Sequence, residues 1–350
     1  MKIIESFLYE IVFRLMMAQN NVKSEAGHMK AKILYDNDIG VDCDDAGAMA
    51  VMHELSALGE CDILAVTHCC SGPFNAGCID SINRYFGRPD IPVGVFHAED
   101  RVQTKWQDIY AHVIAQRFTH SFPDEHLCPD TVSVMREILA RAENNDVILV
   151  ATGSLYSLRR LLESPPDMYS SLCGRELICS KIKKTVIMGG RFHQQWPDPV
   201  VLDDGYVVDA EFNIACDISS AQKVCNEWPG ELVFCSYEIG YSLHTGARLQ
   251  TEGLEGNPVH VSYEVYGAKN NIIGRESWDL ATMLYAVRPD AGYWKLHEYG
   301  RVEVDDHGVT VWMPDSSAHH TFLLENKTTD EIRTVLDGFL DADLIRHQRK

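Results

Sequence analysis

From residue 32 onward, short apolar runs alternate with segments in which apolar residues recur at helical spacing. The runs have the length of buried strands, and the segments between them are long enough for helices. Strands are predicted over residues 32–35, 63–67, 91–95, 147–151, 185–188 and 231–235. Helices are predicted over residues 46–58, 75–86, 131–142, 155–162, 219–226 and 278–287. A hairpin is expected over residues 301–312, with its turn at 305–308.

This alternation predicts an α/β fold: an open, mostly parallel sheet with helices on both faces and a Rossmann-like core. Ligands bind such sheets at the carboxyl ends of the strands, where the polar clusters of this chain fall. Residues 29–350 are interpreted as a single domain. Residues 1–28 form a leader with the apolar spacing of an amphipathic helix, and its internal acids and missing basic start argue against a secretory signal.

Charge and cysteine content narrow the class of protein. The formal net charge of −20 disfavours a nucleic-acid polymer as partner, and no apolar run is long enough for a membrane span. The 11 cysteines are odd in number and irregular in spacing, which fits a reducing compartment. A cytoplasmic protein acting on a small molecule is therefore expected.

Five aspartates stand within ten positions, where the first predicted strand meets the first predicted helix: Asp36, Asp38, Asp42, Asp44 and Asp45. Such carboxylates repel one another unless a cation lies among them, and Ca²⁺ binds 6–8 oxygen ligands of this kind. Two other interpretations stay open at this point. The segment is compatible with a capped turn of solvated acids, or with the aspartate nucleophile of a phosphohydrolase, with Asp36 attacking and Asp38 as acid–base.

Five motifs in order give the chain a family resemblance. Asp-x-Asp-x-Gly at 36–40 leads to Asp-Asp-Ala at 44–46, and residues 82–93 read INRYFGRPDIPV. ATGSL at 151–155, MGG at 188–190 with AEFN at 210–213, and SWD at 277–279 follow. Together they resemble the inosine–uridine-preferring nucleoside hydrolases over about residues 31–290. The later motifs have no use in a phosphohydrolase, so that alternative loses weight.

The resemblance implies a role for each matched residue. A Ca²⁺ site would comprise Asp38, Asp45, Asp279 and the backbone carbonyl of Tyr156, with Asp38 as the base that takes a proton from water. Ribose hydroxyls would be bound by Asp44, Asn213 and Glu211. The implied reaction is hydrolysis of the N-glycosidic bond of a ribonucleoside or related N-ribosyl compound. Members are usually oligomeric, so a homo-oligomer is an expectation.

Three departures from the family pattern concern the ligands and the leaving group. Two residues are inserted before Asp44, which makes Asp42 an alternative ligand, and Gly205 stands where the family has an asparagine. Trp278 replaces the histidine that protonates the departing base in related enzymes, and it either stacks on a purine or packs in the core. Candidate replacement acids are His193, Tyr241 and His244, and His68 is a further pocket candidate. A non-catalytic or altered ribosyl-binding protein is the remaining alternative.

Overall fold

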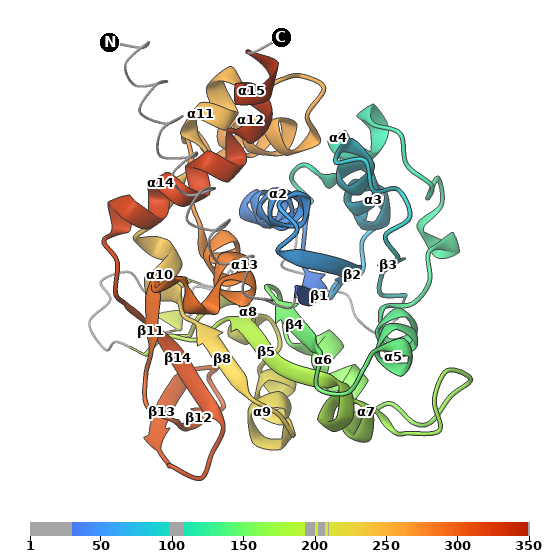
Figure 1. The fold of residues 1–350 in the computed structure, drawn as a ribbon, viewed down its shortest axis with the longest axis vertical. Helices are drawn as coiled ribbons and strands as arrows, with labels where there is room; N and C mark the ends of the chain where they lie inside the picture. The colour runs from blue at the N-terminus through green and yellow to red at the C-terminus, as the bar shows by residue number, and fades with distance from the viewer. Residues whose placement is uncertain (1–29, 98–107, 193–199, 202–206, 209, 349–350) are drawn as a thin grey trace.

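A ten-stranded sheet runs through the centre of the computed structural model, which describes residues 30–97, 108–192, 200–201, 207–208 and 210–348 (Figure 1). Its parallel strands stand in the order β3 (Val93–Gly94), β2 (Cys61–His68), β1 (Ala31–Asn37), β4 (Val147–Ala151), β5 (Ile182–Met188), β8 (Leu232–Cys235) and β14 (His320–Glu325). Antiparallel strands extend the β14 side: β12 (Gly300–Val304), β13 (Thr310–Pro314) and β11 (Trp294–Leu296).

The strand order reverses beside β1. From β1 the chain proceeds to β2 on one side, and later continues from β4 on the other. Loops that leave the carboxyl ends of β1 and β4 therefore diverge, which opens a crevice in sheets of this type. The first aspartates follow β1 at this point, so the fold places them where open α/β sheets bind ligands.

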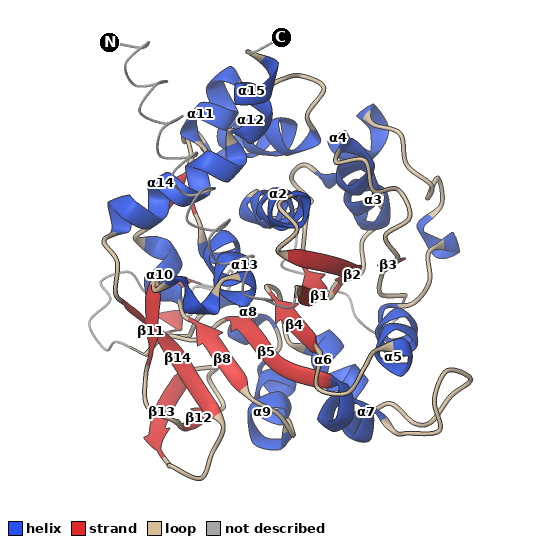
Figure 2. Ribbon diagram, in the orientation of Figure 1, coloured by secondary structure: helices blue, strands red, loops and turns tan. Residues whose placement is uncertain are grey.

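Helices cover both faces of the sheet (Figure 2). Along β1, Ile33 and Tyr35 pack into one apolar core and Leu34 into the other, because successive strand residues point to opposite faces. The first core is shared with α2 (Asp44–Ala57), α3 (Asn75–Tyr85), α4 (Ala111–Arg117), α12 (Pro258–Asn270), α13 (Trp278–Val287) and α14 (Thr329–Leu340). The second is shared with α5 (Thr131–Arg141), α6 (Tyr156–Leu162), α7 (Gly174–Lys181) and α9 (Ile218–Glu227).

Shorter elements complete the described part. They are the helices α8 (Phe212–Cys216), α10 (Tyr237–Tyr241), α11 (Ala247–Glu252) and α15 (Ala342–His347), the paired strands β6 (Val200–Val201) with β7 (Val207–Val208) and β9 (His244–Thr245) with β10 (Arg275–Glu276), and the 3₁₀ turns Glu125–Leu127 and Pro289–Ala291. In the portion of the chain described, no helix combines the length and apolar character that crossing a bilayer requires.

The predicted fold class is confirmed, as are the six predicted strands, the six predicted helices and the hairpin of β12 and β13. Some boundaries differ. Helix α2 begins at Asp44, two residues earlier than predicted, so that Asp44 and Asp45 lie in its first turn, and β3 covers only two residues. The leader prediction for residues 1–28 lies outside the described residues, and the single-domain organisation stays a prediction.

Candidate active site

Three carboxylates from distant parts of the chain meet at the carboxyl end of β1. Asp38, Asp45 and Asp279 each offer an oxygen, and these oxygens lie within 4.8 Å of one another. Asp38 directly follows β1, Asp45 lies in the first turn of α2, and Asp279 in the first turn of α13. All three side chains are buried. The structure therefore assembles two segments far apart in sequence into one acidic group.

Backbone hydrogen bonds connect the segments that carry this group. The Asp38 backbone N–H donates to Asp45 Oδ1 at 3.3 Å, which ties the end of β1 to the start of α2. The Asp279 backbone N–H donates to Asp44 Oδ2 at 3.2 Å, which ties the start of α13 to the start of α2. Asp44 thus borders the group of three.

Burial dominates the electrostatics of this site. It raises the pKa of Asp38 well above its usual range, and the neighbouring Asp45 raises it further. Burial and the charge of Asp44 also raise the pKa of Asp279. Burial raises the pKa of Asp45 to about 7. Carboxylates this close and this dry do not all ionise unaided. A divalent cation removes that conflict, so the residues present fit a cation site.

The turn that carries the predicted carbonyl ligand runs beside Asp38. A Cβ placed on Gly153 would lie 2.8 Å from Asp38 Cγ, so the turn between β4 and α6 passes against that carboxylate. Tyr156 is the first residue of α6, and its ring packs edge-on against Phe96 with centroids 4.6 Å apart. Its side chain therefore serves packing, and the role of its carbonyl oxygen stays a prediction.

Glu211 and Asn213 lie at the same end of the sheet. The Asn213 amide donates to the carbonyls of Thr152 and Met188, at 3.1 and 3.3 Å, at the ends of β4 and β5. The Glu211 carboxylate accepts from the Asn213 and Ile214 backbone N–H groups and so caps α8. Burial raises the pKa of Glu211 to about 7. Both residues are buried, and their predicted contacts with ribose remain predictions.

Trp278 is packed tightly at the start of α13. Its indole Nε1 donates to the Tyr237 carbonyl at 2.8 Å, and its ring lies 5.4 Å from that of Tyr237. Only 9% of Trp278 is exposed, while Tyr241, which stacks on Tyr237 at 5.5 Å, is 36% exposed. Tyr241 is therefore the most exposed member of this aromatic group.

The remaining candidates are spread around the site. His244 is exposed on β9, and His193 and Gly205 lie outside the described residues. His68, at the end of β2, places Nδ1 2.7 Å from the Cys70 carbonyl oxygen and Nε2 3.1 Å from that of Ile39. It thus ties the loop after β2 to the loop after β1.

Asp42, considered above as an alternative metal ligand, contacts Arg275 instead. Its carboxylate forms an ion pair with Arg275, with Nη2 and Oδ2 2.5 Å apart. In the part of the chain the structure describes, the group of three comprises Asp38, Asp45 and Asp279 without it. Sequence reasoning did not single out Arg275. The signal available was a basic residue three positions before Trp278 in an otherwise acidic chain.

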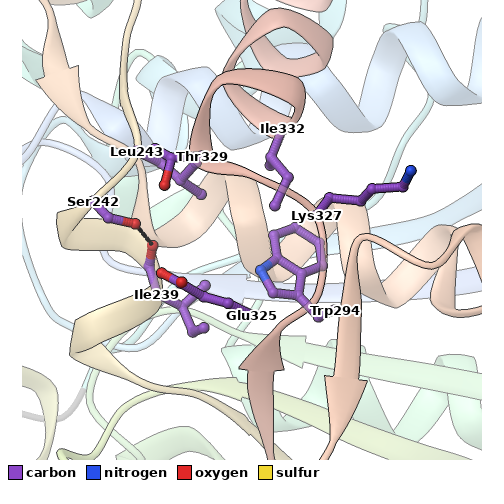
Figure 3. A pocket seen from close by; sticks show the side chains of 8 residues that line it. All are labelled: Ile239, Ser242, Leu243, Trp294, Glu325, Lys327, Thr329 and Ile332. Carbon is purple, nitrogen blue, oxygen red and sulfur yellow. Dashed lines mark hydrogen bonds between the residues drawn. The ribbon is translucent and has the colours of Figure 1, made fainter.

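A small pocket lies elsewhere, between α10, β11, β14 and α14 (Figure 3). Ser242 donates to the Ile239 carbonyl at its wall, and Trp294 and Ile332 supply apolar surface. Its volume of about 10 Å³ is that of a single water site. That volume is too small for a nucleoside. None of the lining residues is a predicted site residue, so the pocket also lies away from the candidate site.

Comparison with known proteins gives the class of enzyme. The family described as inosine-uridine preferring nucleoside hydrolase matches residues 33–336, and the chain belongs to this family. The resemblance predicted from the five motifs is thereby confirmed, and with it the enzyme class of nucleoside hydrolases. A search among curated proteins finds no match.

Solved structures share the fold at low sequence identity. A plant nucleoside hydrolase is 17% identical, with a TM-score of 0.65, covering 90% of this chain and 100% of that one. The inosine-uridine preferring nucleoside hydrolase from Bacillus anthracis is 17% identical, with a TM-score of 0.63 and coverage of 89% and 100%. An inosine-guanosine nucleoside hydrolase is 19% identical, with a TM-score of 0.63 and coverage of 88% and 98%.

Proposed function

We propose that this protein hydrolyses the N-glycosidic bond of a ribonucleoside or related N-ribosyl compound, releasing ribose and the free base. The observation that carries the proposal is the buried group of Asp38, Asp45 and Asp279 at the reversal point of the sheet. Family membership supports the reaction class. Similar structures include a purine-preferring ribonucleoside hydrolase and an effector protein complexed with adenosine diphosphate ribose, and both ligand types contain an N-ribosyl bond.

Calcium is the cofactor we propose. The three carboxylates and the Tyr156 carbonyl are hard oxygen donors, which Ca²⁺ prefers, and water and ribose hydroxyls would complete its coordination. When bound, the ion supplies positive charge and Lewis acidity to a water molecule. Ca²⁺ is a weak acid catalyst compared with Zn²⁺, so a carboxylate is needed to take the proton from that water. Asp38 is the proposed base, because its carboxylate belongs to the ligand group and would lie beside a water bound to the ion.

The other polar residues of the site are proposed to bind the ribose. The ribosyl ring gains oxocarbenium character as the base departs, so negative charge near the ring stabilises the transition state more than the ground state. Asp44, Asn213 and Glu211 are proposed to bind ribose hydroxyls. Their support is their burial at the carboxyl ends of the central strands, where the sugar would lie next to the acidic group.

The departing nucleobase needs another proton donor, because Trp278 stands where the family has its histidine. Tyr241 and Trp278 both contact Tyr237 and form with it an aromatic group that offers a stacking surface, with Tyr241 as its most exposed member. His193, Tyr241 and His244 remain the candidate acids. A cytoplasmic location, a single domain over residues 29–350 and a homo-oligomer are further proposals, which the assays below do not test.

Ribose release tests the proposal directly. Metal-free protein is mixed with inosine, adenosine or uridine, with Ca²⁺ or with chelator, and reducing sugar is measured. Asp38→Asn is expected to reduce kcat/KM by about 10²–10⁴-fold, because it removes the base and replaces a charged ligand with a neutral one. Asp62→Asn, which affects an exposed ion pair with Lys30, is the control with unchanged activity.

Three outcomes separate the alternatives. Calcium-dependent ribose release that is lost in Asp38→Asn supports the hydrolase. Nucleoside binding with no sugar release from any N-ribosyl compound indicates a binding protein with lost chemistry and contradicts the proposal. Phosphate release from a phosphorylated substrate indicates an aspartate-dependent phosphohydrolase and contradicts it as well.

A further inference from the structure

Arg275 contacts two residues at which this chain departs from the family pattern, Asp42 and Trp278. It lies on β10, three residues before Trp278, and its Nε contacts both oxygens of Asp42 at 3.0 and 2.9 Å, while Nη2 contacts Oδ2 at 2.5 Å. Its guanidinium carbon lies 4.8 Å from the centroid of the Trp278 ring. Asp42 belongs to the inserted turn, and Trp278 replaces a histidine, so one cation touches both departures.

Other side chains fix the inserted turn against the same region. The Tyr266 hydroxyl of α12 donates to Asp42 Oδ2 at 3.2 Å, and the Tyr110 hydroxyl donates to the Asp42 carbonyl at 2.8 Å. The side chains of Asp42 and Arg275 are only 24% and 21% exposed. An ion pair with several hydrogen bonds and partial burial has the geometric specificity that exposed pairs lack.

The pair joins the two segments that make up the acidic group. Asp44 and Asp45 follow Asp42 in the chain, and Asp279 follows Arg275 by four residues. The Asp279 backbone N–H already contacts Asp44, so the two segments touch at the site and again at the ion pair. Nη1 of Arg275 is engaged by Glu276 at 2.5 Å, which leaves the guanidinium committed to carboxylates rather than to an anionic ligand.

We propose that Asp42 and Arg275 are positioning residues for the cation site: their ion pair holds the inserted turn and the start of α13 in the relative position that brings Asp45 and Asp279 together. The proposal rests on the proposed function for the existence of that site. In this proposal Asp42 helps to position the metal ligands and is not itself a ligand. Residues that orient metal ligands in this way typically change metal affinity by about 10–100-fold when removed.

Positioning and simple charge predict opposite results for one variant. Arg275 is a positive charge near a cation site, so if charge alone mattered, Arg275→Met would tighten Ca²⁺ binding. If Arg275 positions the ligands, the same change weakens Ca²⁺ binding. In the double variant D42N/R275M both charges are lost together, so charge alone predicts unchanged affinity, while positioning again predicts weaker binding.

The experiment measures Ca²⁺ affinity by titration calorimetry on metal-stripped full-length protein, with circular dichroism to verify folding. Wild type, R275M and D42N/R275M are compared with R301M/E303Q, which removes an exposed ion pair on β12. We expect Ca²⁺ Kd to rise by about tenfold or more in R275M and in the double variant, with R301M/E303Q unchanged. Should R275M fail to fold, the double variant decides, because it removes the Asp42 charge together with that of Arg275.

Equal or tighter Ca²⁺ binding in the folded variants overturns the positioning role, and so does wild-type protein that binds no Ca²⁺. Ribose release is recorded separately from affinity. Wild type that binds Ca²⁺ and releases no ribose contradicts the proposed hydrolysis while the affinity comparison still decides the role of Arg275. The two proposals therefore fail in different measurements.

Discussion

The indole of Trp278 has two attachments that a residue used only for stacking on a ligand does not need. Its Nε1 donates to the Tyr237 carbonyl, and its ring lies under the Arg275 guanidinium. The start of α13 also approaches Gly240 so closely that a Cβ there would overlap the Trp278 ring. Packing therefore places Asp279, the next residue, as well as Trp278 itself.

Replacing Trp278 with phenylalanine tests this role. W278F keeps an aromatic face but removes the indole N–H that donates to the Tyr237 carbonyl, so we expect the free energy of unfolding to fall by about 0.5–1.5 kcal/mol. Denaturant titration measures the change. Because a phenyl face can still stack on a base, KM for a nucleoside is expected to change little. Unchanged stability would contradict the packing role.

At the scale of elements, the site depends on how closely α2 approaches α13. Gly47 of α2 makes this approach possible: a Cβ there would lie 2.8 Å from Leu280 Cδ1 on α13, and closer still to the Tyr263 hydroxyl. Asp45 and Asp279 lie in the first turns of these two helices. A change in helix separation therefore alters the distance between two proposed ligands.

Gly47→Ala is expected to separate the helices. Alanine favours a helix by about 1 kcal/mol over glycine, but overpacking typically costs about 1–3 kcal/mol. We therefore expect a lower Tm and weaker Ca²⁺ binding. Gly338→Ala in α14 is the matched control, since no atom lies within 4 Å of its new Cβ and only the helix gain applies. A G47A protein as stable as G338A would show that the contact is not limiting.

Elements differed in how far their sequence revealed them. Buried parallel strands such as Val147–Ala151 are continuous apolar runs, and the sequence predicts this one with correct ends because its length and its β-branched residues suffice. The aspartates of 36–45 were recognised because they are local in sequence. The ion pair between Asp42 and Arg275 has no such local signal: it arises from tertiary packing between segments more than 200 residues apart. The same applies to the packing of Trp278 against Tyr237.

The whole molecule concentrates buried acids in one place, and its stability should reflect this. In metal-free protein, burial raises the pKa of Asp45 from 3.8 to about 7. The unfolded chain releases that proton near pH 4, so between about pH 4 and 7 the unfolded state binds fewer protons than the folded state. Metal-free protein therefore loses stability as pH rises through this window.

A bound cation favours the ionised carboxylates and offsets that loss. We expect Ca²⁺ to raise Tm more at about pH 7.5 than at about pH 5, as measured by differential scanning fluorimetry against chelator-treated protein. Because the chain carries a net charge of −20, K⁺ at matched ionic strength controls for general screening. Equal Tm increases at the two pH values would contradict a site built from these acids.

Asp38 and Asp279 are about 240 residues apart in the chain, so the members of the acidic group are synthesised at different times. At about 5–20 residues per second, a ribosome makes Asp279 roughly ten to fifty seconds after Asp38. During that interval the first turn of α2 exists without the helix that completes its cation site. A chain that stops before Asp279 contains the residues of six of the ten sheet strands but no complete ligand set, so the cation site can form only after Asp279 has been made.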